Sequence, residues 1–327
     1  MFRSIQTAAA LTIFCAATMP AGGEAATVNT IVSFKGKIGK GAWSVVADAA
    51  GIIYGPLYSG GRFGMGAIFK YDPGKKKFSI LHAFQGGTAD GASPGTPLTL
   101  DNDGMLLGAT RSGGANNSGM IYRMDPSTGA VTDLHDYTTA DVSSVNSVGP
   151  VAPDGLIYGA YGAVIFTLDP ASHAYTVLHT FAGGQSDLSG ANYLRFIDNS
   201  GVLYGVGSGG PANVGGVFKF DTTTLTETIL HFFGAGNYGW YPAAGLLLGA
   251  DGQLYGTTYS GNSNQYGGVY KINPTTGSYD PLANFSPSGL FFPNGPLLSG
   301  PKGVMYGAAR VGGGTGCGAP FPSLGLR

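Results

Sequence analysis

One short pattern recurs along the whole chain and limits what it can fold into. The pattern is Gly-x-apolar-(Tyr or Leu)-Gly, and it reads GIIYG, GMLLG, GLIYG, GVLYG, GQLYG and GVMYG in successive copies. A period near fifty residues is typical of proteins in which each repeat forms one four-stranded antiparallel sheet. The repeat therefore predicts an all-β chain of about six equivalent units. Its copies start at Gly51, Gly104, Gly155, Gly201, Gly252 and Gly303.

Each unit divides into four predicted strands. A short apolar run such as TPLTL leads to a turn such as DNDG, whose glycine allows a tight hairpin, and the Tyr-Gly core is the second strand. A loop rich in Gly and Ser precedes a third strand such as GVFKFD, which ends at an Asp-Pro or Asn-Pro turn. The fourth strand ends in Leu-x-x-aromatic. Side chains alternate along these segments, and helical periodicity is absent.

These units predict a β-propeller of about six four-stranded blades. Residues 27–327 form this single domain from repeats of about 51 residues, with an incomplete last blade. The strand NTIVSF, which begins at Asn29, is expected to supply the edge that the last blade lacks and so to close the ring. An open solenoid is the alternative.

Residues 1–25 have the features of a signal peptide. Arg3 precedes an apolar run from Ala8 to Met19, and small residues lead to a cleavage position after Ala25. A dozen apolar residues are too few to span a bilayer. We therefore expect a secreted chain, extracellular or periplasmic, with no membrane span once the signal is removed. Cys317 would then be the only cysteine, so no disulfide within the chain is expected.

The charge composition excludes two classes of partner. The net charge is −1 and charged residues are 11% of the chain, which leaves no electrostatic basis for binding nucleic acid or acidic lipid. We expect a monomer whose partner is a polysaccharide or a surface protein.

The run LYGTTYSG…GGVYKINPTTG…F resembles the GloVer tandem repeat of bacterial surface proteins described as "choice-of-anchor". The match covers nearly all of the mature chain, and its most complete copies begin at Gly51 and Gly252. The resemblance implies a secreted or surface propeller-like protein and supplies no catalytic residues. Two features depart from the family: an anchor is missing, and the segment from Gly316 lacks the expected Val-Phe-Lys-Leu run. A truncation or a shifted reading frame would explain both.

The histidines are the first catalytic candidates to consider. His82, His135, His179 and His231 occupy the same place in four copies. An active site needs unlike residues that converge on one point, whereas these are spread around the ring, so we expect structural roles in hydrogen bonds between strands. His173 has no partner at a metal-like spacing.

The acidic turns are candidates for cation binding. The DNDG turn at Asp101 lacks the third acidic position and the distant Glu of a calcium loop. The loops around Asp90 and Asp187 are alternatives, but Asp turns that bond their own backbone are far more common. No Gly-x-Ser-x-Gly, His-Glu-x-x-His or Cys-x-x-Cys motif is present. We therefore expect no catalytic residue, no metal and no cofactor.

Residues that break the repeat indicate where a ligand binds. The loop between the second and third strands and the loop between blades fall on one side of the ring, which we call the long-loop face. Aromatic rings and amides with little charge suit a neutral sugar. For Trp240 and Tyr241 the alternative is packing between blades, since Trp43 has a similar place in the first copy. The candidate binding residues are Tyr238, Trp240, Tyr241, Tyr259 and Tyr266, with Phe291, Phe292, Asn237, Asn262, Asn264 and Gln265 around them.

The sequence thus predicts a secreted or surface binding or structural module for an extracellular glycan or protein. The alternative is a propeller-type lyase or hydrolase with its site in the central channel. Such an enzyme needs acids, histidines or a metal that point inward from different blades, and the first strands offer almost none. A third alternative is a degenerate gene product without a working site.

Overall fold

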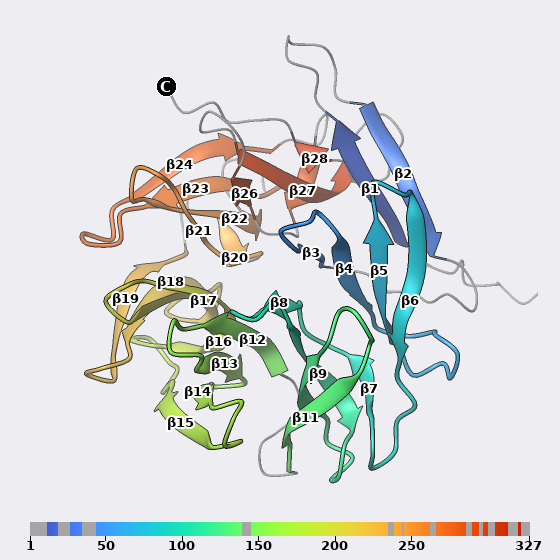
Figure 1. The fold of residues 1–327 in the computed structure, drawn as a ribbon. Helices are drawn as coiled ribbons and strands as arrows, with labels where there is room; N and C mark the ends of the chain where they lie inside the picture. The colour runs from blue at the N-terminus through green and yellow to red at the C-terminus, as the bar shows by residue number, and fades with distance from the viewer. Residues whose placement is uncertain are drawn as a thin grey trace, which may run out of the picture.

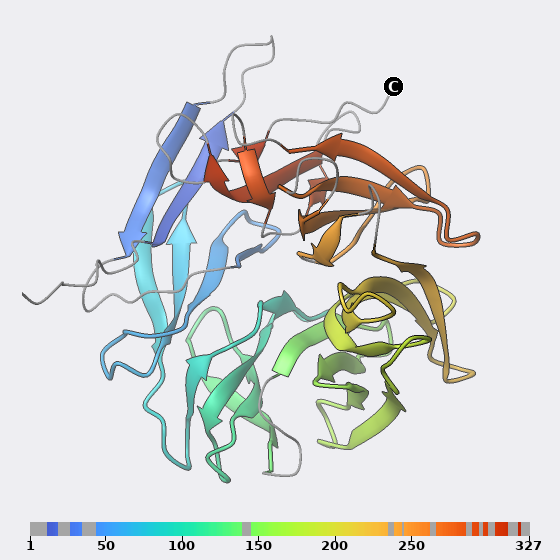
Figure 2. The same ribbon diagram turned by 180° about the vertical axis from the view of Figure 1, so that it is seen from behind.

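The computed structural model is built from strands arranged around a common centre (Figures 1 and 2). All regular elements of the described residues are strands, as the repeat predicts. None of these residues belongs to a helix with the length and hydropathy of a membrane span. The structure describes residues 12–18, 27–34, 44–138, 145–234, 239–243, 245–261, 266–285, 290–293, 297–299, 305–312 and 320–321.

Five blades follow one another around the centre, each an antiparallel sheet in chain order. Blade 1 contains β3 (Val46–Ala47), β4 (Ile53–Leu57), β5 (Ala67–Asp72) and β6 (Lys77–Ala83). Blade 2 contains β7 (Gly91–Pro94), β8 (Thr99–Leu100), β9 (Leu106–Gly113), β10 (Met120–Met124) and β11 (Val131–Asp136). Blade 3 contains β12 (Val145–Val151), β13 (Ile157–Tyr161), β14 (Val164–Leu168) and β15 (Tyr175–Thr180).

Blades 4 and 5 repeat this plan. Blade 4 contains β16 (Leu188–Ile197), β17 (Val202–Gly209), β18 (Gly216–Asp221) and β19 (Thr226–Phe232). Blade 5 contains β20 (Trp240–Pro242), β21 (Leu247–Leu248), β22 (Leu254–Ser260), β23 (Gly268–Ile272) and β24 (Tyr279–Asn284). In blades 2 and 5 the first strand is split into two short pieces that both pair with the second strand.

The expected number of about six blades is wrong, because the last sheet lacks the plan of the other five. It contains β25 (Leu290–Pro293), β26 (Leu298–Ser299), β27 (Met305–Gly312) and β28 (Pro320–Phe321). Its third strand, β28, has two residues, and no fourth strand follows among those described. Pro320 begins β28 where other copies carry a Gly-x-Phe run, and a proline has no N–H to donate to the ladder.

The N-terminal strand pairs differently from our expectation. β2 (Thr27–Phe34), which contains the NTIVSF run, pairs with β1 (Thr12–Thr18) in a separate two-stranded antiparallel sheet. Closure of the ring by this strand is therefore not observed. The hydrogen-bonded partner of β2 is β1, which lies within the expected signal peptide, and among the described residues no strand of the last sheet pairs with β2.

The turn before each core is fixed by one glycine and, in three blades, by one tyrosine. Gly51 has φ +78°, a conformation that side chains disfavour. Asp48 Oδ1 accepts hydrogen bonds from the N–H groups of Ala50 and Ile52, and the Tyr54 hydroxyl donates to Asp48 Oδ2 at 3.0 Å. Tyr204 and Tyr255 repeat this bond to Asp198 and Asp251. The tyrosine of the core thus locks the hairpin that precedes it.

The second glycine of each core lies beneath an aromatic ring of the third strand. Gly55 is opposite Phe69, and Gly205 is opposite Phe218. A Cβ built on either glycine would lie 2.6 Å from the facing ring, which is too close for any side chain. Glycine is therefore required here because the ring occupies the space over the strand. The same pairing recurs between Gly108 and Tyr122, Gly159 and Phe166, and Gly256 and Tyr270.

The Leu-His-x-aromatic signature joins consecutive blades. Its final ring is buried and reaches the third-strand ring of the next blade, as in Phe84 with Tyr122 and Phe233 with Tyr270, at centroid distances of 5.4 and 5.3 Å. A bulge beside the histidine recurs in the pairing of the third and fourth strands. Each of the larger hydrophobic clusters draws its residues from two adjacent blades. The core of this molecule therefore lies between sheets.

Replacing Gly205 by Ala is expected to destabilise the protein by about 1–3 kcal/mol, because the new methyl group overlaps the Phe218 ring and also crowds the Tyr193 carbonyl oxygen. Urea unfolding measures the loss. Gly234→Ala is the matched control, since its Cβ would meet only Ala212 at 3.7 Å. Equal stability of the two variants would contradict the role of the ring.

Candidate binding surface

Trp240 is a packing residue of the interface between blades 4 and 5. Its side chain lies against the cluster that includes Val206 and Val214 of blade 4 and Tyr270 of blade 5. The indole Nε1–H donates to the carbonyl of Gly234 at 3.2 Å. The alternative that we raised for Trp240, packing between blades, describes this position.

Tyr241, in contrast, is exposed. Its side chain is 54% exposed, and its backbone has φ +56° while its N–H donates to the carbonyl of Val214 at 2.8 Å. Ser93 occupies the same position in blade 2, with φ +54° and a bond to Met65 O at 2.6 Å. The left-handed turn before proline therefore recurs in blades 2 and 5, and it presents a different side chain in each.

Tyr259 lies opposite Tyr241 across the same ladder. Trp240 pairs with Ser260 and Pro242 with Thr258, which places residues 241 and 259 between these two pairs. Tyr259 and Tyr266 are both half-buried. The backbones of Tyr241 and Tyr259 therefore lie on adjacent strands. Tyr238, Asn237, Asn262, Asn264 and Gln265 lie outside the described residues, as do the side chains of Phe291 and Phe292.

Sequence reasoning missed an exposed aromatic group on blade 1. Tyr58, Phe63 and Met65 lie on the loop between β4 and β5 and are 39%, 43% and 46% exposed. The Arg111 guanidinium of blade 2 lies 5.8 Å from the centroid of the Tyr58 ring. Tyr58 in IYGPLYSG holds the position of Tyr259 in LYGTTYSG, and this alignment was the signal that would have identified it. The long-loop face thus has exposed aromatic residues on two blades.

The histidines contact rings and acids at the blade boundaries and do not converge on a common point. His82, His135, His179 and His231 each meet, edge to face, the aromatic residue two positions later. Two of them also stack on a tyrosine of the next blade, and the other two lie beside a carboxylate. These contacts pack rings and acids between blades, whereas we expected hydrogen bonding between strands.

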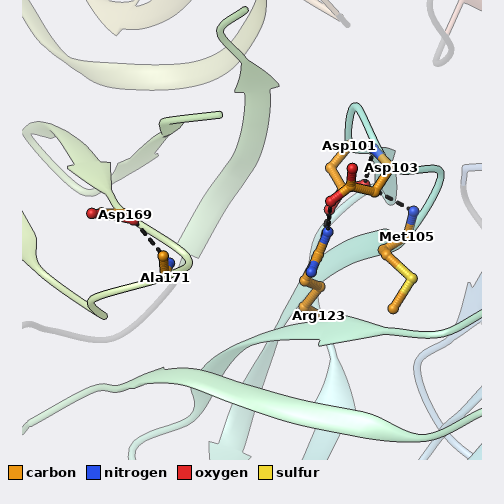
Figure 3. A network of polar contacts seen from close by, with 6 residues as sticks. All are labelled: Asp101, Asp103, Met105, Arg123, Asp169 and Ala171. Atoms are coloured by element: carbon orange, nitrogen blue, oxygen red, sulfur yellow. Dashed lines mark hydrogen bonds and ion pairs between the residues drawn. The ribbon is translucent and has the colours of Figure 1, made fainter. Parts of the chain in front are cut away.

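The Asp101 turn is closed by its own backbone and an arginine (Figure 3). Asp101 Oδ1 accepts from the N–H groups of Asp103 and Met105, and Oδ2 accepts from Arg123 Nε at 2.6 Å. Arg123 also binds Asp103. Because a guanidinium already neutralises both carboxylates, this turn is an ion-paired hairpin. Asp169 caps the Ala171 N–H in the same manner.

Asp90 and Asp187 cap the loops in which they lie. Asp90 Oδ2 accepts from the N–H of Gln85 at 2.8 Å and lies 3.3 Å from His82 Nε2. Asp187 accepts from the N–H groups of Ala182 and Leu188. Among the described residues, no group of three or more His, Cys, Asp or Glu side chains is placed to hold a metal ion.

Among the described carboxyl groups, Glu227 has the most strongly raised pKa. It lies between Asp187 and His179, with Oε2 3.0 Å from His179 Nε2. Burial, together with the charge of Asp187 and a hydrogen bond to it, raises the pKa of Glu227 to about 8. Burial also lowers the pKa of His179. Near neutral pH this boundary therefore favours an uncharged acid beside an uncharged imidazole.

A family model supports the interpretation of the repeat. The Gloeobacter/Verrucomicrobia repeat matches residues 12–163 and again residues 160–322. The chain belongs to this family. No curated protein matches it.

Solved structures with a similar fold include extracellular domains of bacterial proteins. The extracellular domain of BT4673 from B. thetaiotaomicron, described as a one-component system, has a TM-score of 0.61 at 12% identity over 88% of this chain. That of BT3049, described as a hybrid two-component system, has a TM-score of 0.58 at 13% identity over 88%. This chain spans 34% and 35% of their lengths. A nidogen/laminin complex matches with a TM-score of 0.51 at 13% identity, over 75% of this chain and 83% of the other. These similarities show the propeller fold.

The native protein is expected to lose stability as the pH rises toward 8, because Glu227 then gives up its proton. The Glu227→Gln variant should not show this loss. The native carboxyl group keeps its proton up to about pH 8, whereas the unfolded chain releases it near 4.5, so its contribution is full below 4.5 and falls progressively toward pH 8. The amide does not titrate.

Urea unfolding at about pH 7.5 and 8.5 tests this expectation above the ordinary pKa of histidine. The variant should gain stability relative to the native chain at the higher pH. Asp280→Asn, at a side chain 60% exposed, is the control and should follow the native chain. Parallel pH profiles for the Gln variant and the native chain would refute the assignment.

Proposed function

We propose that this chain is an extracellular binding module that holds a neutral polysaccharide on its long-loop face. The observation that carries the proposal is the exposed Tyr241 ring, which lies on the strand next to that of Tyr259 and on a left-handed turn that also occurs in blade 2. A rigid scaffold with variable residues at equivalent turns is the usual arrangement of a binding surface. Residues 1–25 act as the signal peptide and residues 27–327 as the binding domain.

The chemistry of this surface favours a sugar. Tyrosine rings present flat apolar faces for the C–H groups of a pyranose, and their hydroxyls bond to its hydroxyls. Tyr58 and Arg111 place another aromatic ring, beside a cation, at the ends of the second strands of blades 1 and 2. The fold similarity to extracellular domains of bacterial proteins supports a location outside the cell.

Tyr241→Ala is expected to weaken polysaccharide binding about tenfold or more, because it removes an exposed stacking ring. Affinity electrophoresis of the purified protein against a panel of extracellular polysaccharides identifies the ligand, and titration measures the loss. Fluorescence of Trp240, the neighbouring residue, is an independent readout.

Leu225→Ala is the matched control. Leu225 is 50% exposed at φ +55°, but it lies in the turn between β18 and β19, on the other side of the ring from the long loops. Equal binding by the two variants, or a flat panel with protein that melts cooperatively, would exclude a glycan at Tyr241.

A further inference from the structure

In blades 2 to 5, one residue at the start of the fourth strand faces the histidine of the preceding blade. Four such residues are equivalent by their pairing with the end of the third strand: Val131 with Met124, Tyr175 with Leu168, Glu227 with Phe220, and Tyr279 with Ile272. Each of these positions lies at one boundary between blades, so their side chains can be compared directly.

At two boundaries a tyrosine fills the space beside the histidine. The Tyr175 ring stacks on His135 with centroids 4.2 Å apart and planes 9° apart. The Tyr279 ring stacks on His231 at 4.6 Å and 14°. At a third boundary Glu227 lies against His179.

The boundary between blades 1 and 2 carries Val131 at this position, and a groove is present there. Its volume is about 460 Å³, and its lining includes His82, Asp90, Met120, Val131 and Asp133. This volume is within the range of small-molecule sites, about 300–1,000 Å³. The groove lies at the boundary between blades 1 and 2, formed by the end of β6, the loop that follows it, the turn before β11 and the start of β11. It is therefore on other blades than the Tyr241 surface of blade 5.

We propose that this groove binds a phenol-type aromatic ring that stacks on His82. Two other boundaries show the geometry that we expect for this complex. There the phenol rings of Tyr175 and Tyr279 stack on the equivalent imidazoles of His135 and His231. His82 is held for such a contact by Asp90 at 3.3 Å and by the edge of Phe84 at 4.8 Å.

The other lining groups suit the same ligand. Met120 offers a thioether, which contacts aromatic rings favourably. Asp133 supplies an acceptor for a phenolic hydroxyl. Burial and the neighbouring Asp136 raise the pKa of Asp133 to about 6, so its carboxylate remains charged at pH 7 to 8.

Titration with 4-methylphenol, followed by saturation-transfer NMR, tests the site. We expect saturable binding to the native chain and binding at least about tenfold weaker in Val131→Tyr, whose new ring takes the ligand's place. Val177→Tyr, at a position 48% exposed on β15, is the control and should bind as the native chain does. A melting temperature for each variant confirms folding.

The reciprocal variant keeps the proposal testable if Val131→Tyr does not fold. Tyr175→Val should open an equivalent groove beside His135 and add a second binding site. A capped Gly-Tyr-Gly peptide identifies the source of the ring: binding of the peptide indicates a tyrosine of a partner protein, and binding of 4-methylphenol alone indicates a free phenol. No binding of either probe, or binding that Val131→Tyr leaves unchanged, would overturn the proposal.

Discussion

The contact between a third-strand ring and a second-strand glycine is the interaction on which the rest of the structure depends. In each of the five blades the ring lies over the glycine of the core, so the two strands are pinned in one register. The same rings, Tyr122, Phe218 and Tyr270 among them, then receive the fourth-strand aromatic residue of the preceding blade. One repeated pair of residues thus fixes both the blade and its contact with the neighbour.

This dependence explains why variation is confined to a few positions. A substitution beneath the ring or at the fourth-strand aromatic residue disturbs two blades at once, because the hydrophobic clusters span the boundaries. The turn that holds Ser93 and Tyr241 is bonded through its backbone to the preceding blade, so its side chain is free to differ. The end of the second strand, with Tyr58, Arg111 and Tyr259, has the same freedom. A binding surface that differs among relatives of this repeat would be built at these positions.

Much of the fold was predictable from the sequence, because the residues of the repeat are those that its turns and strands require locally. The turn glycines, the four strands and the propeller follow from spacing and side-chain alternation, and the structure contains them. The blade count was not predictable in the same way, since it depends on whether the segments around Asn29 and Pro320 find partners elsewhere in the ring. Trp240 and Tyr241 are adjacent in sequence, yet Trp240 is packed and Tyr241 is exposed. The difference arises from a left-handed turn at Tyr241, which the residue types at these positions do not predict.

The histidine boundaries show how a repeat protein acquires a site without a new motif. At three of the four histidine boundaries a ring or an acid lies beside the histidine and fills the space between two blades, as Tyr175, Tyr279 and Glu227 do. A smaller residue at that one position leaves the walls intact, because His82 keeps its contacts with Asp90 and Phe84. The resulting groove has a volume of about 460 Å³. Val131 taken alone is an ordinary strand residue. The site becomes visible only when the equivalent residues of the blades are aligned by their register in the sheet.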